Sequence, residues 1–196
     1  MKNICVFCGS SMGFDKRYAE AASRLGDVLA DNDCTLIYGG ASVGLMNVIA
    51  ERMLARGKKV IGVMPDFLIA HEIAHTAITT MIPTKTMAER KEILIRESDG
   101  FIAMPGGFGT LDEFSEVVVA DQLRLIEKPI ALYNTLGYYD DLVRWIDRGV
   151  KDGFVRGDHY KNVIVTDDPK ELFAKMQDYN PVRIEKWIHD IKLENK

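Results

Sequence analysis

The feature that most constrains the fold is a short apolar run that leads through a glycine-rich loop into a helical pattern. The run, residues 101–104, contains Phe, Ile, Ala and Met without polar alternation. Such a run is typical of a strand covered on both faces, as in a parallel sheet. Pro105 ends the strand, and apolar residues then recur at helical spacing at Leu111, Phe114, Val117 and Val118. This order of strand, loop and helix predicts one unit of an α/β fold.

The same order recurs along the chain. Strands are predicted at residues 2–8, 36–38, 60–63, 129–133 and 163–166, and helices at about 15–31, up to Gly57, at 86–97 and 138–152, and after Asp168. A chain of 196 residues is long enough to bury one core without disulfides or a metal. The alternation predicts an α/β fold with a doubly wound, Rossmann-like parallel sheet, in a single domain over residues 1–196.

The last part of the sequence has an amphipathic pattern. Apolar residues share one helical face at Ile184, Trp187, Ile188 and Ile191. This pattern predicts a helix at about residues 182–192 that docks on the core or on a partner chain.

Charge and hydropathy exclude several classes of partner. A net charge of -4 argues against non-specific nucleic-acid binding, which needs a basic surface. The apolar runs are far too short to span a membrane. Met1 leads directly into the first predicted strand, with no secretory cleavage site. We therefore expect a cytoplasmic protein with neither a nucleic-acid nor a membrane partner.

The cysteines fit a cytoplasmic protein. Cys5, Cys8 and Cys34 are odd in number, so structural disulfides are not expected. The spacing of Cys5 and Cys8 invites a redox or zinc interpretation. Residues three apart in a strand face opposite sides, however, so the interpretation favoured is that both pack in the core.

The glycine-rich loop is predicted to bind an anion. Gly106, Gly107 and Gly109 allow backbone amides to approach a ligand closely, and the helix that Thr110 opens adds unpaired amides and a positive dipole end. Thr110 and Glu113 also fit a capping box that would satisfy the amides of the helix itself. A cap needs no preceding glycines, so their density favours a phosphate site.

Two better-known ligands are not supported by the motifs. A dinucleotide site needs G-x-G-x-x-G after the first strand and an acidic residue at the end of the second, whereas Gly39 and Gly40 end the second strand here. His71 and His75 match the H-E-x-x-H zinc pattern, but a third ligand and a long helix are lacking. We therefore expect no cofactor and no metal. The glycines after strands one and two, with the Pro105 loop, are expected to line one crevice.

A second helix begins with cations that a helix N-terminus disfavours. Thr86 and Glu89 predict a capping box for a helix that continues to about Glu97. Arg90 and Lys91 then lie in its first turn, where the dipole is unfavourable to positive charge. The alternative is a solvated pair on an exposed helix. A local rule broken without visible gain indicates a functional site.

Four motifs in order resemble one family. Residues 105–113 resemble the PGGxGTxxE signature of the LOG family, the cytokinin riboside 5'-monophosphate phosphoribohydrolases formerly described as lysine decarboxylases. The other matching stretches are residues 7–13, 38–46 and 87–91, and the similarity extends from residue 1 to about 180. Ala88, Phe108 and Asn47 depart from residues that are frequent in relatives, and these departures affect the expected base preference.

The resemblance implies hydrolysis of the N-glycosidic bond of a purine nucleoside 5'-monophosphate by a protein that assembles as a homodimer. AMP and N6-substituted nucleotides both stay open as substrates. Such a bond breaks through a cationic sugar, which a carboxylate stabilises. Glu113 would supply it, and the helix dipole is expected to favour its ionised form. The family implies Arg90 as its catalytic partner. The substrate-binding residues it implies are Ser10, Gly40, Met87, Lys91, Gly107, Gly109 and Thr110.

Two other functions compete with this one. A non-catalytic carrier of a nucleotide or phospho-cofactor could use the same fold and crevice, but it would need neither Arg90 nor Glu113. A lysine decarboxylase would need a pyridoxal-binding lysine with a supporting acid, and no motif indicates them.

Overall fold

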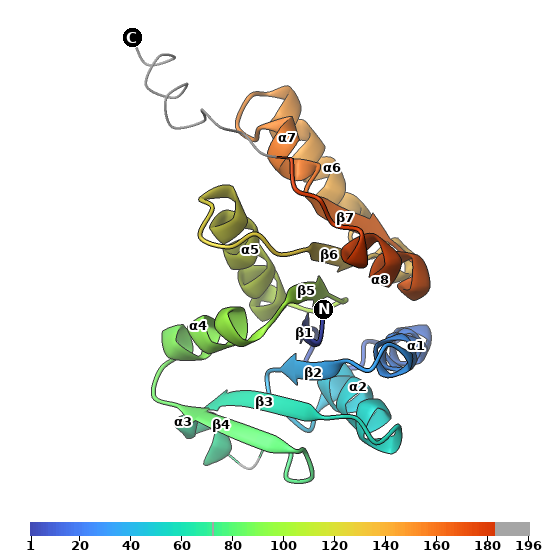
Figure 1. Cartoon of the computed structure of the whole chain (residues 1–196), viewed down its shortest axis with the longest axis vertical. Helices are drawn as coiled ribbons and strands as arrows, with labels where there is room; N and C mark the ends of the chain where they lie inside the picture. The colour runs from blue at the N-terminus through green and yellow to red at the C-terminus, as the bar shows by residue number, and fades with distance from the viewer. Residues whose placement is uncertain (72, 183–196) are drawn as a thin grey trace.

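The computed structural model describes residues 1–71 and 73–182, and within them seven parallel strands form one sheet in the order β4-β3-β2-β1-β5-β6-β7 (Figure 1). The strands are β1 (Asn3–Phe7), β2 (Thr35–Tyr38), β3 (Val60–Pro65), β4 (Thr80–Thr84), β5 (Gly100–Ala103), β6 (Ile130–Tyr133) and β7 (Val163–Thr166). Every pairing is parallel. The prediction of a single α/β domain with a doubly wound parallel sheet is therefore confirmed.

Helices connect the strands. The longer ones are α1 (Arg17–Asp31), α2 (Gly44–Ala55), α4 (Met87–Glu97), α5 (Phe108–Gln122), α6 (Asp140–Lys151) and α8 (Pro169–Gln177). Three short ones, α3 (Asp66–Ile69), the 3-10 turn η1 (Thr135–Gly137) and α7 (Gly157–Tyr160), lie in connections where the sequence predicted no helix. Among the described residues, no helix is both long and apolar enough to cross a bilayer. The predicted helix at about residues 182–192 falls almost wholly outside the described residues.

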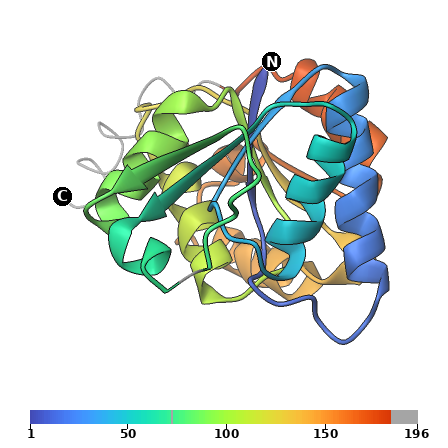
Figure 2. The ribbon, with the colours of Figure 1, turned by 90° about the horizontal axis from the view of Figure 1, so that it is seen from below.

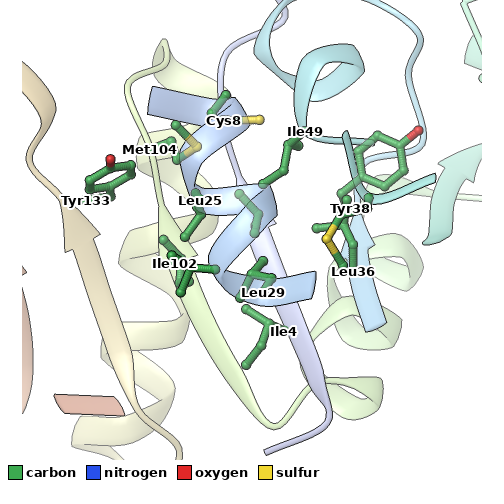
Figure 3. Close-up of a cluster of buried hydrophobic side chains, with 14 of the residues drawn as sticks. Ile4, Cys8, Leu25, Leu29, Leu36, Tyr38, Ile49, Ile102, Met104 and Tyr133 are labelled. Carbon is green, nitrogen blue, oxygen red and sulfur yellow. The ribbon is translucent and has the colours of Figure 1, made fainter. Parts of the chain in front are cut away.

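The helices form a layer on each face of the sheet. In Figure 1, α1, α2 and α8 lie on one side of the strands and α4 and α5 on the other, and Figure 2 shows α1 and α2 opposite α4 from below. Alternate residues of β1 enter the two layers, since Ile4 and Val6 belong to one apolar cluster and Cys5 and Phe7 to the other. Figure 3 shows the first cluster, in which Ile4 lies near Leu29 of α1 and Ile102 of β5.

The cysteines behave as core residues. All three are free and buried, and Cys5 and Cys8 belong to opposite clusters. Burial raises the pKa of both thiols, which makes them poor nucleophiles at neutral pH. The core interpretation of the C-x-x-C spacing is confirmed.

Local signals explain the helix ends. The Thr86 side chain accepts a hydrogen bond from the Glu89 amide at 3.1 Å and so caps α4 where the capping box predicted. The Asp168 side chain caps α8, with Pro169 in the first turn. Gly57 has a φ of 68° directly after α2, as expected of a C-terminal glycine. The sheet order reverses between β1 and β5, so the helices that follow these two strands lie on opposite faces of the sheet, and the loops that lead into them are at the usual place for a ligand.

Candidate active site

The loops that follow β1 and β5 meet at the carboxyl edge of the sheet. The Gly9 amide donates to the Pro105 carbonyl at 3.0 Å, which joins the two loops directly. They line a cavity of about 310 Å³, whose residues are 9–13, Tyr18, Leu45, 105–107 and Tyr138. The predicted crevice therefore forms between the first loop and the Pro105 loop, but Gly39 and Gly40, which were also expected to line it, do not.

The glycines of the second loop have different roles. A Cβ on Gly106 would lie 2.2 Å from Thr110 Oγ1 and 2.9 Å from the Gly9 nitrogen, so no larger residue fits there. A Cβ on Gly107 or on Gly109 would meet no atom within 4 Å. Gly106 is thus needed for packing of the two loops, and the open space beside Gly107 and Gly109 is available to a ligand.

The α5 helix begins earlier than the sequence predicted. Its first residue is Phe108 and its N-cap is Gly107, which offers no side-chain hydrogen bond. Thr110 and Glu113 therefore lie inside the helix, and the capping box considered for them does not form. The first amides of α5 remain without a side-chain cap, at the edge of the cavity that Gly107 lines. This arrangement suits an anion.

Arg90 and Glu113 form a buried ion pair between α4 and α5. Arg90 Nη1 lies 2.9 Å from Glu113 Oε1, and the two side chains are only 11% and 10% exposed. Arg90 Nε also donates to the Val63 carbonyl of β3 at 3.0 Å. A Cβ on Gly39, at the end of β2, would lie 2.5 Å from Arg90 Nη2. The position of the Arg90 guanidinium therefore depends on β3, on α5 and on a glycine at the end of β2. The alternative interpretation of Arg90 as a solvated cation on an exposed helix is wrong.

The Glu113 carboxyl is less acidic than the sequence indicated. Burial raises its pKa, and the adjacent Arg90 guanidinium only partly opposes this. The dipole of α5 was expected to favour ionisation. That expectation fails because Glu113 is the sixth residue of a helix that starts at Phe108, beyond the first turn in which the dipole acts. A carboxyl of raised pKa beside a fixed cation can both stabilise positive charge and exchange a proton.

Lys91 points to a different part of α5. Its Nζ lies 3.2 Å from Asp112 Oδ2 and 2.7 Å from Glu116 Oε2. The hydrogen bond with Glu116 is the largest cause of the raised pKa of Lys91, so it stays protonated. Lys91 does not line the 310 Å³ cavity.

The remaining expected residues are not all brought to the cavity. Ser10 and Gly107 line the cavity. Gly40 has a φ of 83° and its carbonyl accepts from the His75 amide at 2.8 Å. Met87 is the first residue of α4 and is 41% exposed.

Sequence reasoning missed two tyrosines in the cavity wall. The Tyr138 hydroxyl donates to the Gly106 carbonyl at 2.5 Å, and its ring meets Tyr18 edge-on with centroids 5.9 Å apart. Both rings line the cavity. Tyr138 lies shortly after β6, the strand beside β5, so its position after a neighbouring carboxyl end was the signal available in the sequence.

The two histidines of the zinc-like pattern lie in different environments. The α3 helix ends at Ile69, before either of them. His71 Nδ1 is exposed and lies 2.7 Å from the Phe67 carbonyl, whereas His75 is buried with Nε2 2.9 Å from Glu51 Oε1. Within residues 1–71 and 73–182, no three His, Cys, Asp or Glu side chains are grouped to hold a metal ion.

Several solved structures share this fold. The molybdenum cofactor binding protein from Rippkaea orientalis superimposes with a TM-score of 0.68 at 21% identity, covering 91% of this chain and 97% of that one. The molybdenum cofactor carrier protein of Chlamydomonas reinhardtii gives a TM-score of 0.67 at 22% identity, with coverage of 91% and 97%. At these identities the likeness establishes the fold alone.

Sequence comparison is more specific. A family model described as "possible lysine decarboxylase" matches residues 46–176. A probable cytokinin riboside 5'-monophosphate phosphoribohydrolase of Oryza sativa subsp. japonica is 40% identical over 193 residues, 98% of this chain and 79% of the relative. A cytokinin riboside 5'-monophosphate phosphoribohydrolase of Arabidopsis thaliana is 41% identical over 180 residues, 92% of this chain and 84% of the relative. Since the similarity spans most of both chains, this protein belongs to the LOG family and is a homologue of its phosphoribohydrolases.

Proposed function

We propose that the protein hydrolyses the N-glycosidic bond of a purine nucleoside 5'-monophosphate and releases the free base and ribose 5-phosphate. The observation that carries this proposal is the buried Arg90–Glu113 pair, one helical turn from the glycine loop that Thr110 contacts. Burying both charges costs free energy, and an apolar pair would pack there at no such cost. Chemistry that requires a carboxylate beside a fixed cation explains why the pair is present.

The reaction needs stabilisation of a developing positive charge on the ribose. As the bond between the anomeric carbon and the purine nitrogen breaks, the sugar becomes oxocarbenium-like. Glu113 lies opposite that charge and takes a proton from the attacking water, while Arg90 fixes its orientation. The water oxygen bonds to the anomeric carbon as the bond to the purine nitrogen breaks, and the proton that Glu113 takes from the water is passed on to the departing purine. The raised pKa of Glu113 suits proton acceptance near neutral pH.

The phosphate is assigned to the cavity between the two loops. The uncapped amides of α5 and the open space at Gly107 and Gly109 support this placement. Thr110 and Ser10 add hydroxyl groups. A volume of about 310 Å³ lies at the lower end of the range of small-molecule sites. Gly40, Met87 and Lys91 would contact the rest of the nucleotide.

The proposal includes an assembly and a location. Exposed Leu123 and Leu125, at the end of α5, support a homodimer, because large exposed apolar side chains favour association. Three free, buried cysteines support a cytoplasmic protein.

A non-catalytic phospho-cofactor carrier is the second candidate. It is favoured by the names of the solved structures that share the fold, which are molybdenum cofactor binding and carrier proteins. A carrier would use the phosphate cavity, but it gives no role to a buried Arg90–Glu113 pair.

The experiment that tests the proposal compares AMP, an N6-isopentenyl AMP and adenosine as substrates, with chromatographic measurement of free base. Each charge-assisted hydrogen bond contributes about 1.5 to 3 kcal/mol, so adenosine should lose several powers of ten in kcat/KM relative to AMP. Remote phosphate binding also orients the ribose, so part of the loss should appear in kcat. Comparable values for AMP and adenosine would contradict the phosphate assignment. Nucleotide binding without any base release would favour the carrier.

A further inference from the structure

Two consecutive tyrosines, from the connection between β6 and α6, hold the loop that follows β5. The Tyr138 hydroxyl donates to the Gly106 carbonyl at 2.5 Å. The Tyr139 hydroxyl donates to the Met104 carbonyl at the same distance. The carbonyl between these two accepts from the Gly9 amide at 3.0 Å. Three successive carbonyls of the loop are therefore each held by a donor from another part of the chain.

The two tyrosines act on different kinds of peptide group. The Met104 carbonyl belongs to the peptide with Pro105, which has no amide hydrogen to offer to a ligand. The Gly106 carbonyl belongs to the peptide with Gly107, whose N–H points to the opposite side of the trans peptide plane. A hydrogen bond that fixes the Gly106 carbonyl therefore also fixes the direction of the Gly107 amide.

The peptide between the two glycines has little steric resistance to a flip. A flip rotates ψ of the residue before the peptide and φ of the residue after it. Gly107 has a φ of -95°, and a flip would carry it into the positive-φ region, which glycine adopts about as readily as the negative one. The Gly106 oxygen would then take the place of the Gly107 amide at the start of α5, where it would repel a phosphate. The Tyr138 hydrogen bond opposes this flip.

The turn that carries the tyrosines is itself held in one conformation. The Asn134 side chain accepts from the Tyr139 amide and donates to Asp140, both at 2.7 Å. Leu136 has a φ of 58°, which residues other than glycine rarely adopt. The Tyr138 ring packs edge-on against Tyr139, with centroids 5.1 Å apart. The direction of the Tyr138 hydroxyl is therefore set by the turn and by its neighbour.

We propose that Tyr138 is a positioning residue, which holds the Gly106–Gly107 peptide in the orientation that binds the phosphate. The hydroxyl has one proton, and the Gly106 carbonyl accepts it, so Tyr138 acts on the phosphate through the loop. Tyr139 stabilises the end of β5 and has no part in binding. The inference rests on the proposed function for the place of the phosphate, but binding alone can test it, without turnover.

Binding of ribose 5-phosphate to Tyr138→Phe, measured by calorimetry, tests the proposal. Phenylalanine keeps the ring and its edge-on contact with Tyr18, and removes only the hydrogen bond. The apparent dissociation constant rises as the binding-competent fraction falls. Since one hydrogen bond is lost, we expect ribose 5-phosphate to bind about 3 to 10-fold more weakly. Binding equal to that of the wild type would overturn the proposal.

Tyr139→Phe is the matched control, because it removes the same group one residue away. Tyr139 and Met104 are both buried, so the loss of this hydrogen bond leaves a buried carbonyl without its partner. Tyr139→Phe should therefore lower the Tm more than Tyr138→Phe, and it should leave ribose 5-phosphate affinity unchanged. Equal losses of affinity in the two variants would mean that both hydroxyls only stabilise the fold, which would overturn the proposal.

Steady-state kinetics with AMP give a second readout. Saturating phosphate selects the binding orientation of the peptide, so Tyr138→Phe should raise KM for AMP and leave kcat near the wild-type value. A fall in kcat with an unchanged KM would overturn the proposal. If the wild type binds ribose 5-phosphate but releases no base from AMP, the proposed function fails. The affinities of the two variants would then still decide the role of Tyr138.

Discussion

Two neighbouring cations of α4 bind carboxylates of α5 in opposite environments. Arg90 forms the inner pair with Glu113, and the two contacts of Lys91, with Asp112 and Glu116, are together called the outer pair. Arg90 and Glu113 are 11% and 10% exposed, whereas Lys91 pairs with Asp112, which is 61% exposed, and with Glu116, which is 37% exposed. Exposed pairs contribute at most about 1 kcal/mol and are screened by salt. Burying an ion pair costs desolvation free energy, and the attraction between the two charges offsets this cost only when their hydrogen-bond geometry is good. The outer pair therefore contributes little to holding the two helices together, and the inner pair is accounted for by the proposed function.

The largest expected effect distinguishes the two neighbouring carboxylates on α5. Glu113→Gln should lower turnover by about 10² to 10⁴-fold, because a positioned charge and proton acceptor are lost. The matched change Asp112→Asn, which affects only the outer pair, should leave turnover within about twofold, as is usual for surface charges. Base release from AMP measures both, with circular dichroism to verify folding. Normal turnover in Glu113→Gln would reduce Glu113 to a structural residue.

Exchanging the two cations sharpens the comparison on α4. Arg90 donates in two directions, to Val63 and to Glu113, which a lysine cannot reproduce. Arg90→Lys should therefore lower kcat by about 10 to 100-fold, the equivalent of one charge-assisted hydrogen bond. Lys91→Arg should change kcat little, since a longer cation still reaches Asp112 or Glu116; because Lys91 is also proposed to contact the nucleotide, any loss should appear in KM. Steady-state kinetics of the two variants measure this difference. Similar losses of kcat in both would mean that the inner and outer pairs do not differ in function.

The pH dependence of stability provides a smaller effect. Burial raises the folded-state pKa of Glu113 above its ordinary value of 4.5. Its stabilising contribution is then complete below that value and is lost as the pH rises through the folded-state pKa. Glu113→Gln does not titrate, so its Tm should fall less than the wild-type Tm between about pH 4.5 and pH 8. Thermal melts across this range test it, with Asp112→Asn expected to follow the wild type. Parallel curves for all three would contradict the raised pKa.

The smallest effect belongs to the outer pair. Glu116→Gln removes the 2.7 Å partner of Lys91. It should lower the free energy of unfolding by at most about 1 kcal/mol, and high salt should abolish the difference because the pair is partly solvated. Urea unfolding at low and high ionic strength measures this. A larger loss that persists in high salt would show that the outer pair is as insulated as the inner one.

The sequence predicted six of the seven described strands, because these are short apolar runs between turns and helices. It did not predict the edge strand β4, which contains Pro83. The strand at residues 163–166 and the cap of α4 at Thr86 were found where predicted. The start of α5 was placed two residues late, since Thr110 fits a capping pattern and Gly107 carries no such signal. Because of that shift, Glu113 lies beyond the first turn, where the helix dipole does not favour its ionised form. Burial raises its pKa instead. Burial comes from packing of distant elements, and one sequence does not reveal it.

The contacts of Lys91 and Tyr138 could not be predicted from the sequence for the same reason. Lys91 was expected at the nucleotide on family resemblance, and its pairing with Asp112 and Glu116 depends on how α4 lies against α5. Tyr138 contacts Gly106, 32 residues away in the chain. Whether Ser10, Met87, Lys91 and the other expected residues contact substrate stays a prediction.

The central place of β1 has a consequence for how the protein acquires its activity. β1 pairs with β2, which follows one helix later, and with β5, where Ile4 lies opposite Gly100. Closing so long a loop is slow compared with the formation of local contacts. During synthesis, the first half of the chain can bring Arg90 onto its sheet while Glu113 has yet to follow. We therefore expect nucleotide binding to be among the last properties that the folding chain gains.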